Sequence, residues 1–296
     1  MIDMSDLDLA LLRTFVAIVD TGGVTSAGRA VGRTQSAVTH QIGRLEAQLG
    51  RPVFGPDRRR ITLTADGEIL LEYARAMLRL SEEARARFAV PGVAGRVTLG
   101  TPDLYAAYLL PEVLGRFSRA YPEIEIQLHC RRSVYLHAEL MRDKLDIAIL
   151  TEQPDLHRGE AVRTEPLSWV AGRGGRPETD DPIPLAVLPA GSVYRQRALE
   201  ALGAAGRRWT IRSVSDTIAG LQAAVFARLA VSVFPHCAMS GGMRRLGEED
   251  GMPRLPNIDL VLVRRPTGIS DAAEHLAHYI SRELRNAAAF RPVRDI

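Results

Sequence analysis

Short polar side chains lie near the beginning of the stretch GRTQSAVTHQIGRLEAQLG (residues 32–50). Apolar residues recur in it at steps of four, three and four: Val38, Ile42, Leu45 and Leu49. This period predicts a helix with one buried face. Hydroxyl, amide and imidazole groups on the other face could read base edges from the major groove of DNA, although a merely solvated helix is the alternative. The base-reading candidates are Thr34, Gln35, Ser36, Thr39 and His40.

Arginines surround this predicted helix. Between residues 29 and 60 the only acids are Glu46 and Asp57, whereas the whole chain of 296 residues carries a net charge of +3. Such a local basic block favours a polyanionic partner, and guanidinium groups position a protein on DNA by contacting phosphates. The expected phosphate contacts are Arg33, Arg44, Arg58, Arg59 and Arg60.

The elements needed to hold this helix are predicted around it. An apolar period over residues 9–19 predicts a first helix, which Gly22-Gly23 ends, and Thr25 can cap a short second helix. The stretch FGPDRRRITLT (54–64) combines turn residues with alternation and predicts a hairpin wing that carries three arginines. Residues 1–65 are therefore predicted to form an all-α winged helix-turn-helix that binds DNA.

A longer helix follows the wing. Its apolar residues repeat at three-four spacing: Leu70, Tyr73, Met77, Leu80, Ala84 and Phe88. This stripe is typical of a coiled coil. It could pack on the chain's own core, but we expect a homodimer in which residues 66–91 pair with a second copy.

Composition changes after Pro91-Gly92, and strand-like runs then alternate with helix-like runs. The expected strands are 96–100, 124–130, 145–150, 166–172, 183–188, 209–212, 230–235 and 259–265, and the expected helices are 104–121, 134–144, 193–205, 216–228 and 270–288. Alternation predicts parallel sheets with crossover helices. We expect residues 92–296 to form a two-lobed α/β domain, with lobe 1 at about 92–161 plus 266–296 and lobe 2 at about 162–265. A ligand would bind at the carboxyl ends of the strands.

The N-terminal region resembles that of LysR-type transcriptional regulators over about residues 7–90, on the runs TQSAVTHQI, RLE and LTADG. Two further stretches, LLPEVLGRFSRAYPEIEIQL with KLDIAIL and then AGLQAAVFARLAVSVFP, resemble the two halves of the inducer domain of that family. The resemblance implies a periplasmic-binding-protein-like effector domain and a dimer through the linker helix, often a tetramer. It also implies binding to double-stranded promoter DNA, with a small molecule altering DNA bending and contact with RNA polymerase.

The effector site implied by the resemblance combines the turn after the first strand, the loop after the second strand and residues of the second lobe. In the turn after the first strand, Thr101 and backbone N–H groups could hold an anion. Asp103 is expected to cap its own helix. If it faces the cleft instead, it would repel a carboxylate, whereas Arg132 would attract one, so either charge of ligand is compatible with the sequence. The expected effector contacts are Thr101, Pro102, Asp103, Arg131, Arg132, Ser133, Ser192, Thr217 and Pro235.

The sequence departs from the family pattern in three regions. Gly43 replaces a usual Lys or Arg on the exposed face of the reading helix, which concentrates the expected base contacts between Gln35 and His40. The wing reads Gly55-Pro56 where an arginine is common, and Arg228 and Ala230 replace usual glycines in the second lobe.

Other functions are weaker interpretations. Two pairs, His129-Cys130 and His236-Cys237, could serve a metal- or redox-responsive regulator, but neighbours on a strand point to opposite faces, so no metal site is expected. A solute-binding protein is a further alternative. We expect no enzyme and no cofactor, because GxSxG, HExxH, P-loop and dinucleotide-binding motifs are absent.

The chain is expected in the reducing cytoplasm. Its N-terminus, MIDMSDLDLALLRTF, has acids where a signal peptide would have a basic leader, and the two cysteines form no CxxC motif. No apolar run approaches the roughly 20 residues that span a membrane, so no membrane partner is expected.

Overall fold

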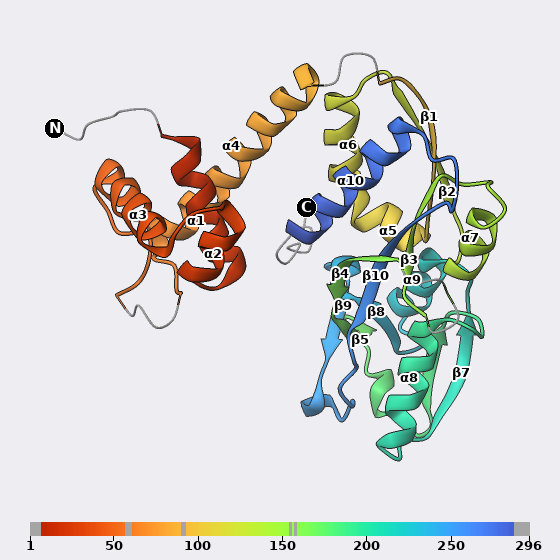
Figure 1. The fold of residues 1–296 in the computed structure, drawn as a ribbon. Coiled ribbons are helices and arrows are strands. Elements are labelled where there is room, and N and C mark those ends of the chain that lie inside the picture. Colours follow the sequence, from red (N-terminus) through yellow and green to blue (C-terminus); the bar gives the residue numbers. More distant parts are fainter. Residues whose placement is uncertain (1–6, 57–60, 90–92, 154–155, 157–158, 287–296) are drawn as a thin grey trace. The chain divides into compact units, whose positions relative to one another are not determined.

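The computed structural model describes residues 7–56, 61–89, 93–153, 156 and 159–286. The chain divides into two compact units, residues 1–91 and 92–296, each with its own core (Figure 1).

The described residues of the N-terminal unit form four helices: α1 (Leu9–Thr21), α2 (Val24–Val31), α3 (Gln35–Leu49) and α4 (Ala65–Ala89). The predicted apolar face of α3 is confirmed, because Val38 and Leu45 are fully buried and pack with Phe15 of α1 in one cluster. Glycines with positive φ end α1 and α2, at Gly22 (φ 69°) and Gly32 (φ 66°), where other residues would be strained.

The start of α2 differs from the prediction. The helix begins at Val24 with Gly23 as its N-cap, and Thr25 does not cap it. The Thr25 hydroxyl instead donates to the side-chain oxygen of Gln35, at 3.2 Å, which ties α2 to the first turn of α3.

The predicted wing is reduced in the described residues to one antiparallel bridge between Phe54 and Leu63. The Gly55 N–H donates to the carbonyl of Thr62 at 2.9 Å, and the Thr64 N–H donates to that of Val53 at 3.1 Å. The two arms of the predicted hairpin are therefore paired, but they form a single bridge and no continuous strand. Arg58, Arg59 and Arg60 lie outside the described residues.

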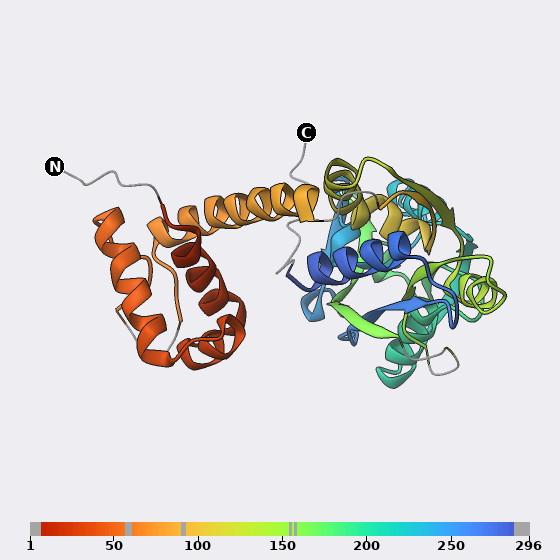
Figure 2. The same ribbon diagram turned by 45° about the horizontal axis from the view of Figure 1, so that its top comes forward.

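The LTADG run forms the beginning of α4. The Thr64 hydroxyl accepts a hydrogen bond from the Gly67 N–H at 3.0 Å, as an N-cap does. A side chain at position 67 would collide with the backbone, because its Cβ would lie 2.1 Å from the carbonyl oxygen of Val53. Arg51 pairs with Asp66 at 3.1 Å. The helix continues unbroken from there (Figure 2).

The first lobe of the C-terminal unit is built on a five-stranded sheet of order β2-β1-β3-β10-β4. Its strands are β1 (Gly95–Thr101), β2 (Ile124–Cys130), β3 (Ile147–Thr151), β4 (Glu160–Glu165) and β10 (Ile258–Arg264). Its helices are α5 (Asp103–Tyr108), α6 (Leu110–Ala120), α7 (Ser133–Leu140) and α10 (Asp271–Asn286). Helices α6 and α10 lie side by side, joined by an ion pair of 2.7 Å between Arg116 and Glu283 (Figure 1).

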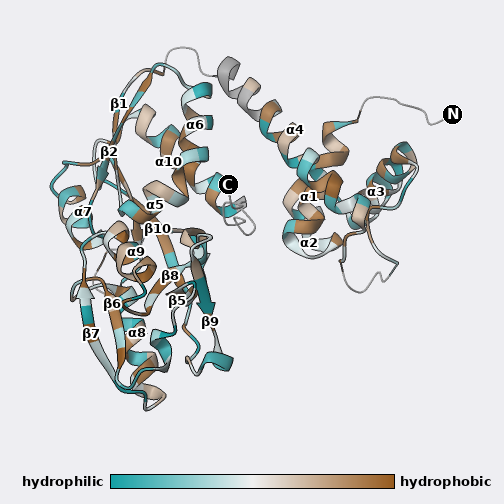
Figure 3. Cartoon of the chain, turned by 180° about the vertical axis from the view of Figure 1, so that it is seen from behind, coloured by the Kyte–Doolittle hydropathy of each residue, from teal (hydrophilic) through white to brown (hydrophobic). Residues whose placement is uncertain are grey.

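The second lobe combines two small sheets, β8-β5-β9 and β6-β7. Its strands are β5 (Leu167–Gly172), β6 (Ile183–Val187), β7 (Trp209–Val214), β8 (Ser232–Pro235) and β9 (Met243–Leu246), and its helices are α8 (Val193–Ala204) and α9 (Ile218–Phe226). Three short 3₁₀ turns, at Pro177–Thr179, His236–Ala238 and Glu248–Asp250, complete the described elements. Strand β6 is largely hydrophobic (Figure 3) and all of its residues are buried, as expected of a strand that is covered on both faces.

Three sequence expectations for this unit are wrong. The five-stranded sheet is mixed, because β10 runs antiparallel to β3 and β4, and the three-stranded sheet is antiparallel, because β5 runs antiparallel to β8 and β9. Strand β10 lies in the first sheet, whereas the prediction places these residues in the second lobe. The expected helix at 104–121 is interrupted at Leu109, because Pro111 has no N–H to continue the ladder.

Candidate functional site

The N-terminal edge of α3 is an exposed polar surface. The residues predicted to contact DNA that the structure describes are all exposed: Arg33, Thr34, Gln35, Ser36, Thr39, His40 and Arg44. Those between Thr34 and His40 line one shallow depression. Gly43 lies on the same helix with no atom within 4 Å of an added Cβ, so the middle of this face is bare.

Hydrogen bonds hold the side chains at this edge. Thr34 is the N-cap, and its hydroxyl accepts from the Ala37 N–H at 3.3 Å and lies 3.0 Å from the Ser36 hydroxyl. The Thr39 hydroxyl donates to the carbonyl of Gln35 at 3.1 Å. The short side chains are thus ordered at little entropic cost, while each hydroxyl oxygen keeps capacity for a further partner.

A buried polar contact, which sequence reasoning missed, fixes α3 against α1. The Thr14 hydroxyl lies 2.6 Å from the side-chain oxygen of Gln41, and these side chains are 1% and 9% exposed. Gln41 is a polar residue on the otherwise apolar, buried face of α3. Its position on that face could have indicated a buried hydrogen bond.

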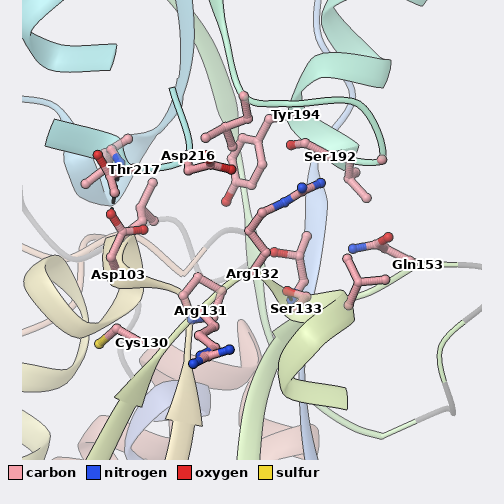
Figure 4. Close-up of a pocket in the computed structure, with 18 residues that line it drawn as sticks. Asp103, Cys130, Arg131, Arg132, Ser133, Gln153, Ser192, Tyr194, Asp216 and Thr217 are labelled. Atoms are coloured by element: carbon pink, nitrogen blue, oxygen red, sulfur yellow. Dashed lines mark hydrogen bonds between the residues drawn. The ribbon is translucent and has the colours of Figure 1, made fainter. Parts of the chain in front are cut away.

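A second site lies between the two lobes of the C-terminal unit, at a cavity of about 120 Å³ (Figure 4). Seven of the predicted effector contacts line it: Pro102, Asp103, Arg131, Arg132, Ser133, Ser192 and Thr217. Thr101 and Pro235 do not line it; both are buried in strands. The Thr101 hydroxyl is buried with no hydrogen-bond partner among the described residues. Sequence reasoning missed other polar lining residues: Thr151, Gln153, Tyr194 and Asp216.

The cavity lies where the parallel strands predicted it. Its walls come from the segments after the carboxyl ends of β1, β2 and β3 in the first lobe, and of β6 and β7 in the second. Open α/β sheets place their ligands at this edge.

Asp103 joins the lobes at one side of the cavity. Its carboxylate accepts a hydrogen bond of 2.9 Å from the Ile218 N–H, at the first turn of α9. The prediction that Asp103 caps its own helix is wrong, because α5 has no side-chain cap. Thr217 also caps α9, accepting from the Gly220 N–H at 3.3 Å.

Other contacts also cross between the lobes. The Arg132 guanidinium donates to the carbonyl of Ala190 at 2.7 Å. The Tyr105 hydroxyl lies 2.7 Å from that of Thr151 and 3.0 Å from that of Tyr194. Burial raises the pKa of both tyrosines, so they remain neutral hydrogen-bonding groups.

The cysteines lack the properties of redox or metal sites. Cys237 is buried, which raises the pKa of its thiol, and desolvation with the nearby Asp103 carboxylate raises that of Cys130. A reactive thiol needs the opposite shift. No cluster of three or more metal-ligating side chains occurs in the part of the chain that the structure describes. His129 lies on β2, and His236 bonds Ser168 at 2.8 Å. The metal- or redox-responsive alternative has no support here.

A helix-turn-helix unit joined to a two-lobed α/β unit with an interlobe cavity defines a ligand-responsive DNA-binding regulator. Comparison with known families agrees. Residues 9–68 match the bacterial regulatory helix-turn-helix protein of the lysR family, and residues 91–285 match the LysR substrate binding domain. The chain belongs to the LysR family of transcriptional regulators, and its C-terminal domain is an effector-binding domain.

Curated relatives are regulators of the same kind. The chain is 37% identical to the HTH-type transcriptional regulator PecT of Dickeya dadantii over 261 residues, which cover 88% of this chain and 83% of PecT. It is 32% identical to the HTH-type transcriptional regulator DgdR of Burkholderia cepacia over 274 residues, covering 91% and 93%. These relatives give no support to a solute-binding protein.

Solved structures share the fold. The LysR-family regulator HinK of Pseudomonas aeruginosa has a TM-score of 0.54 at 20% identity, covering 94% of this chain and 99% of HinK. DarR of Vibrio fischeri, solved in complex with DNA, has a TM-score of 0.54 at 16% identity, covering 94% and 99%. Among the described residues, no helix is long and apolar enough to cross a bilayer.

Proposed function

We propose that the N-terminal edge of α3 reads base edges in a major groove of promoter DNA. The main support for this proposal is the row of exposed polar side chains Gln35, Ser36, Thr39 and His40. Thr34 contacts Ser36, and Thr39 bonds the backbone of Gln35, so these side chains are ordered. Gly43 has no side chain that could obstruct the row. Arg33 and Arg44 flank the row and form no ion pair within the described residues, so both are free for phosphates. Arg58, Arg59 and Arg60 are proposed as further phosphate contacts.

A gel shift tests this proposal. The labelled probe is the DNA upstream of the gene that encodes the chain, and random DNA of equal length is the competitor. Retention of the upstream probe at moderate salt, against an excess of competitor, is the expected result. Equal competition by random DNA would contradict specific recognition.

We propose that α4 mediates dimerisation, within domain limits of 1–65, 66–91 and 92–296. Leu70, Ala74 and Leu78 of α4 pack on the core of its own unit. A second stripe on the same helix is exposed: Ile69 (57%), Tyr73 (63%), Met77 (37%) and Leu80 (65%). Large apolar groups at this spacing suit a second copy of the helix. Of the predicted stripe, Leu70 thus belongs to the core, and the Phe88 side chain lies outside the described ones.

Sedimentation velocity tests the dimer. Tyr73→Glu with Leu80→Glu should shift the chain toward a monomer, while Glu68→Gln, an exposed change away from the stripe, should not. An unchanged association constant in the double variant would contradict the proposal. A tetramer made of two such dimers would appear as a second, concentration-dependent species.

We further propose that a small-molecule effector binds the interlobe cavity and alters DNA bending and contact with RNA polymerase. The main support for this proposal is the set of hydrogen bonds that join the two lobes at the cavity rim. A ligand bound beside these hydrogen bonds would change the relative stability of different arrangements of the lobes. The proposal includes no catalysis and no cofactor, and it places the chain in the cytoplasm with the chromosome. The test is the DNA bend angle of the complex with and without an effector.

A further inference from the structure

Four helix N-termini line the interlobe cavity, those of α5, α7, α8 and α9, and they differ in how they are capped. The end of α9 is occupied by the protein itself, since Asp103 and Thr217 accept its N–H groups. The ends of α5, α7 and α8 have no side-chain cap. Free N–H groups at a helix start favour an anion, and the two longer of these uncapped helices, α7 and α8, face the cavity from opposite lobes.

A nearly buried serine marks the same place. Ser192, the N-cap of α8, is only 9% exposed and lines the cavity, and its hydroxyl has no hydrogen-bond partner among the described residues. A hydroxyl left open to a cavity in this way can donate to a bound ligand or accept from it. Arg132 extends from the start of α7 toward the loop that carries Ser192 (Figure 4), and its donation to Ala190 leaves other N–H groups for the same ligand.

The charges at the cavity leave one of each sign available. Arg131 pairs with Glu139 at 3.3 Å, and Asp103 is engaged with the end of α9. Arg132 and Asp216 have no ion-pair partner in the described chain, and both line the cavity. A dianion would be repelled by Asp216, whereas a ligand with separated positive and negative groups satisfies both residues.

The rest of the lining is largely apolar and comes from Leu104, Val134, Leu188, Val193 and Ile218. Together these features define the chemistry of the ligand. We propose that the effector is a small α-amino acid with an aliphatic side chain. Its carboxylate binds Ser192, Arg132 and the free helix ends, and its ammonium group binds Asp216. This inference rests on the proposed effector role of the cavity.

Thermal unfolding of the full chain tests the ligand class with matched probes. L-alanine, L-valine and L-leucine are compared with their deaminated acids (propionate, 3-methylbutanoate and 4-methylpentanoate). They are also compared with their decarboxylated amines (ethylamine, isobutylamine and isoamylamine). At about 10 mM, at least one amino acid should raise Tm by about 2 °C or more, while its acid and its amine do not. Stabilisation by an acid or an amine as large as that by its amino acid would overturn the proposal, and so would no stabilisation by any probe.

Variants locate the two charges. Arg132→Gln and Asp216→Asn should each weaken the affinity for the amino acid, by calorimetry, about tenfold. The matched controls Arg142→Gln and Asp180→Asn, at exposed sites away from the cavity, should not change it. Ser192→Ala should weaken binding by a smaller factor. Equal losses in variants and controls would overturn the placement. Binding of the ligand-free variants to upstream DNA is measured in parallel, so failure of the amino-acid proposal with intact DNA binding leaves the regulator function standing.

Discussion

The carboxylate of Asp103 lies 2.9 Å from the backbone nitrogen of Ile218 and closes the N-terminus of a helix in the other lobe. This single bond links the first turn of α5 to the first turn of α9 across the effector cavity. It also supplies α9 with the negative charge that helix N-termini favour.

The first prediction concerns this bond. Asp103→Ala should lower the free energy of unfolding of the C-terminal unit by about 1 kcal/mol, because the Ile218 N–H loses its acceptor. Asp103→Asn should retain most of that stability, since the amide oxygen can accept the same bond. Urea denaturation measures both. An equal loss in the two variants would show that charge, and not the hydrogen bond, is what matters.

The second prediction concerns the buried contact between α1 and α3. Thr14→Val should cost about 1–2 kcal/mol, because it leaves the Gln41 side-chain oxygen buried without a donor. Adding Gln41→Leu should recover part of the loss. A double-mutant cycle measures the coupling, and strict additivity of the two changes would refute the contact.

The third prediction compares two helical glycines. Gly43→Ala should stabilise the N-terminal unit by about 1 kcal/mol, because the position is exposed, open and in mid-helix. Gly67→Ala, the matched control, should destabilise it, because the new Cβ would lie 2.1 Å from the Val53 carbonyl oxygen. Thermal unfolding measures both. Destabilisation by Gly43→Ala would mean that this face is not bare.

The fourth prediction concerns pH. Burial, together with the nearby Arg245, lowers the pKa of His236 below its ordinary value of 6.5. The folded chain therefore holds the neutral imidazole, and the unfolded chain binds a proton first. This contribution to stability is complete above pH 6.5 and is lost as the pH falls below 6.5 through the lower folded-state pKa.

His236→Gln should accordingly flatten the decline of the unfolding free energy below pH 6.5. Equal slopes in His236→Gln and the wild type would contradict the assignment.

Periodicity and local turn chemistry made much of the fold predictable. The step of Val38, Ile42 and Leu45 located the buried face of α3, and the glycines after α1 and α2 located their ends. Most strands of the C-terminal unit were visible as apolar runs, and they placed the cavity at their carboxyl ends. These features depend on residues close together in sequence, where hydrophobic pattern and backbone freedom decide the structure.

Contacts between distant segments were not predictable. The bond from Asp103 to Ile218 joins residues 115 apart, and the sequence around Asp103 suggested only a local cap. Strand β10 returns to the first sheet after the whole second lobe, and nothing in DLVLVRR specifies which sheet it joins. Asp216 is an exposed loop residue. It becomes a candidate effector contact only because it lines the same cavity as Arg132 of the other lobe.

The N-terminal edge of α3 is proposed to read DNA sequence, and the regulator function requires this activity above all others. The decisive measurement is the ratio of dissociation constants for random and upstream DNA, determined by fluorescence anisotropy over a range of salt concentrations. Ser36→Ala and Thr39→Ala should reduce this ratio about fivefold or more while changing affinity for random DNA little. Arg33→Ala and Arg44→Ala should weaken both affinities alike and lower the salt slope by about one. Equal effects of all four substitutions on the two DNAs would contradict the claim.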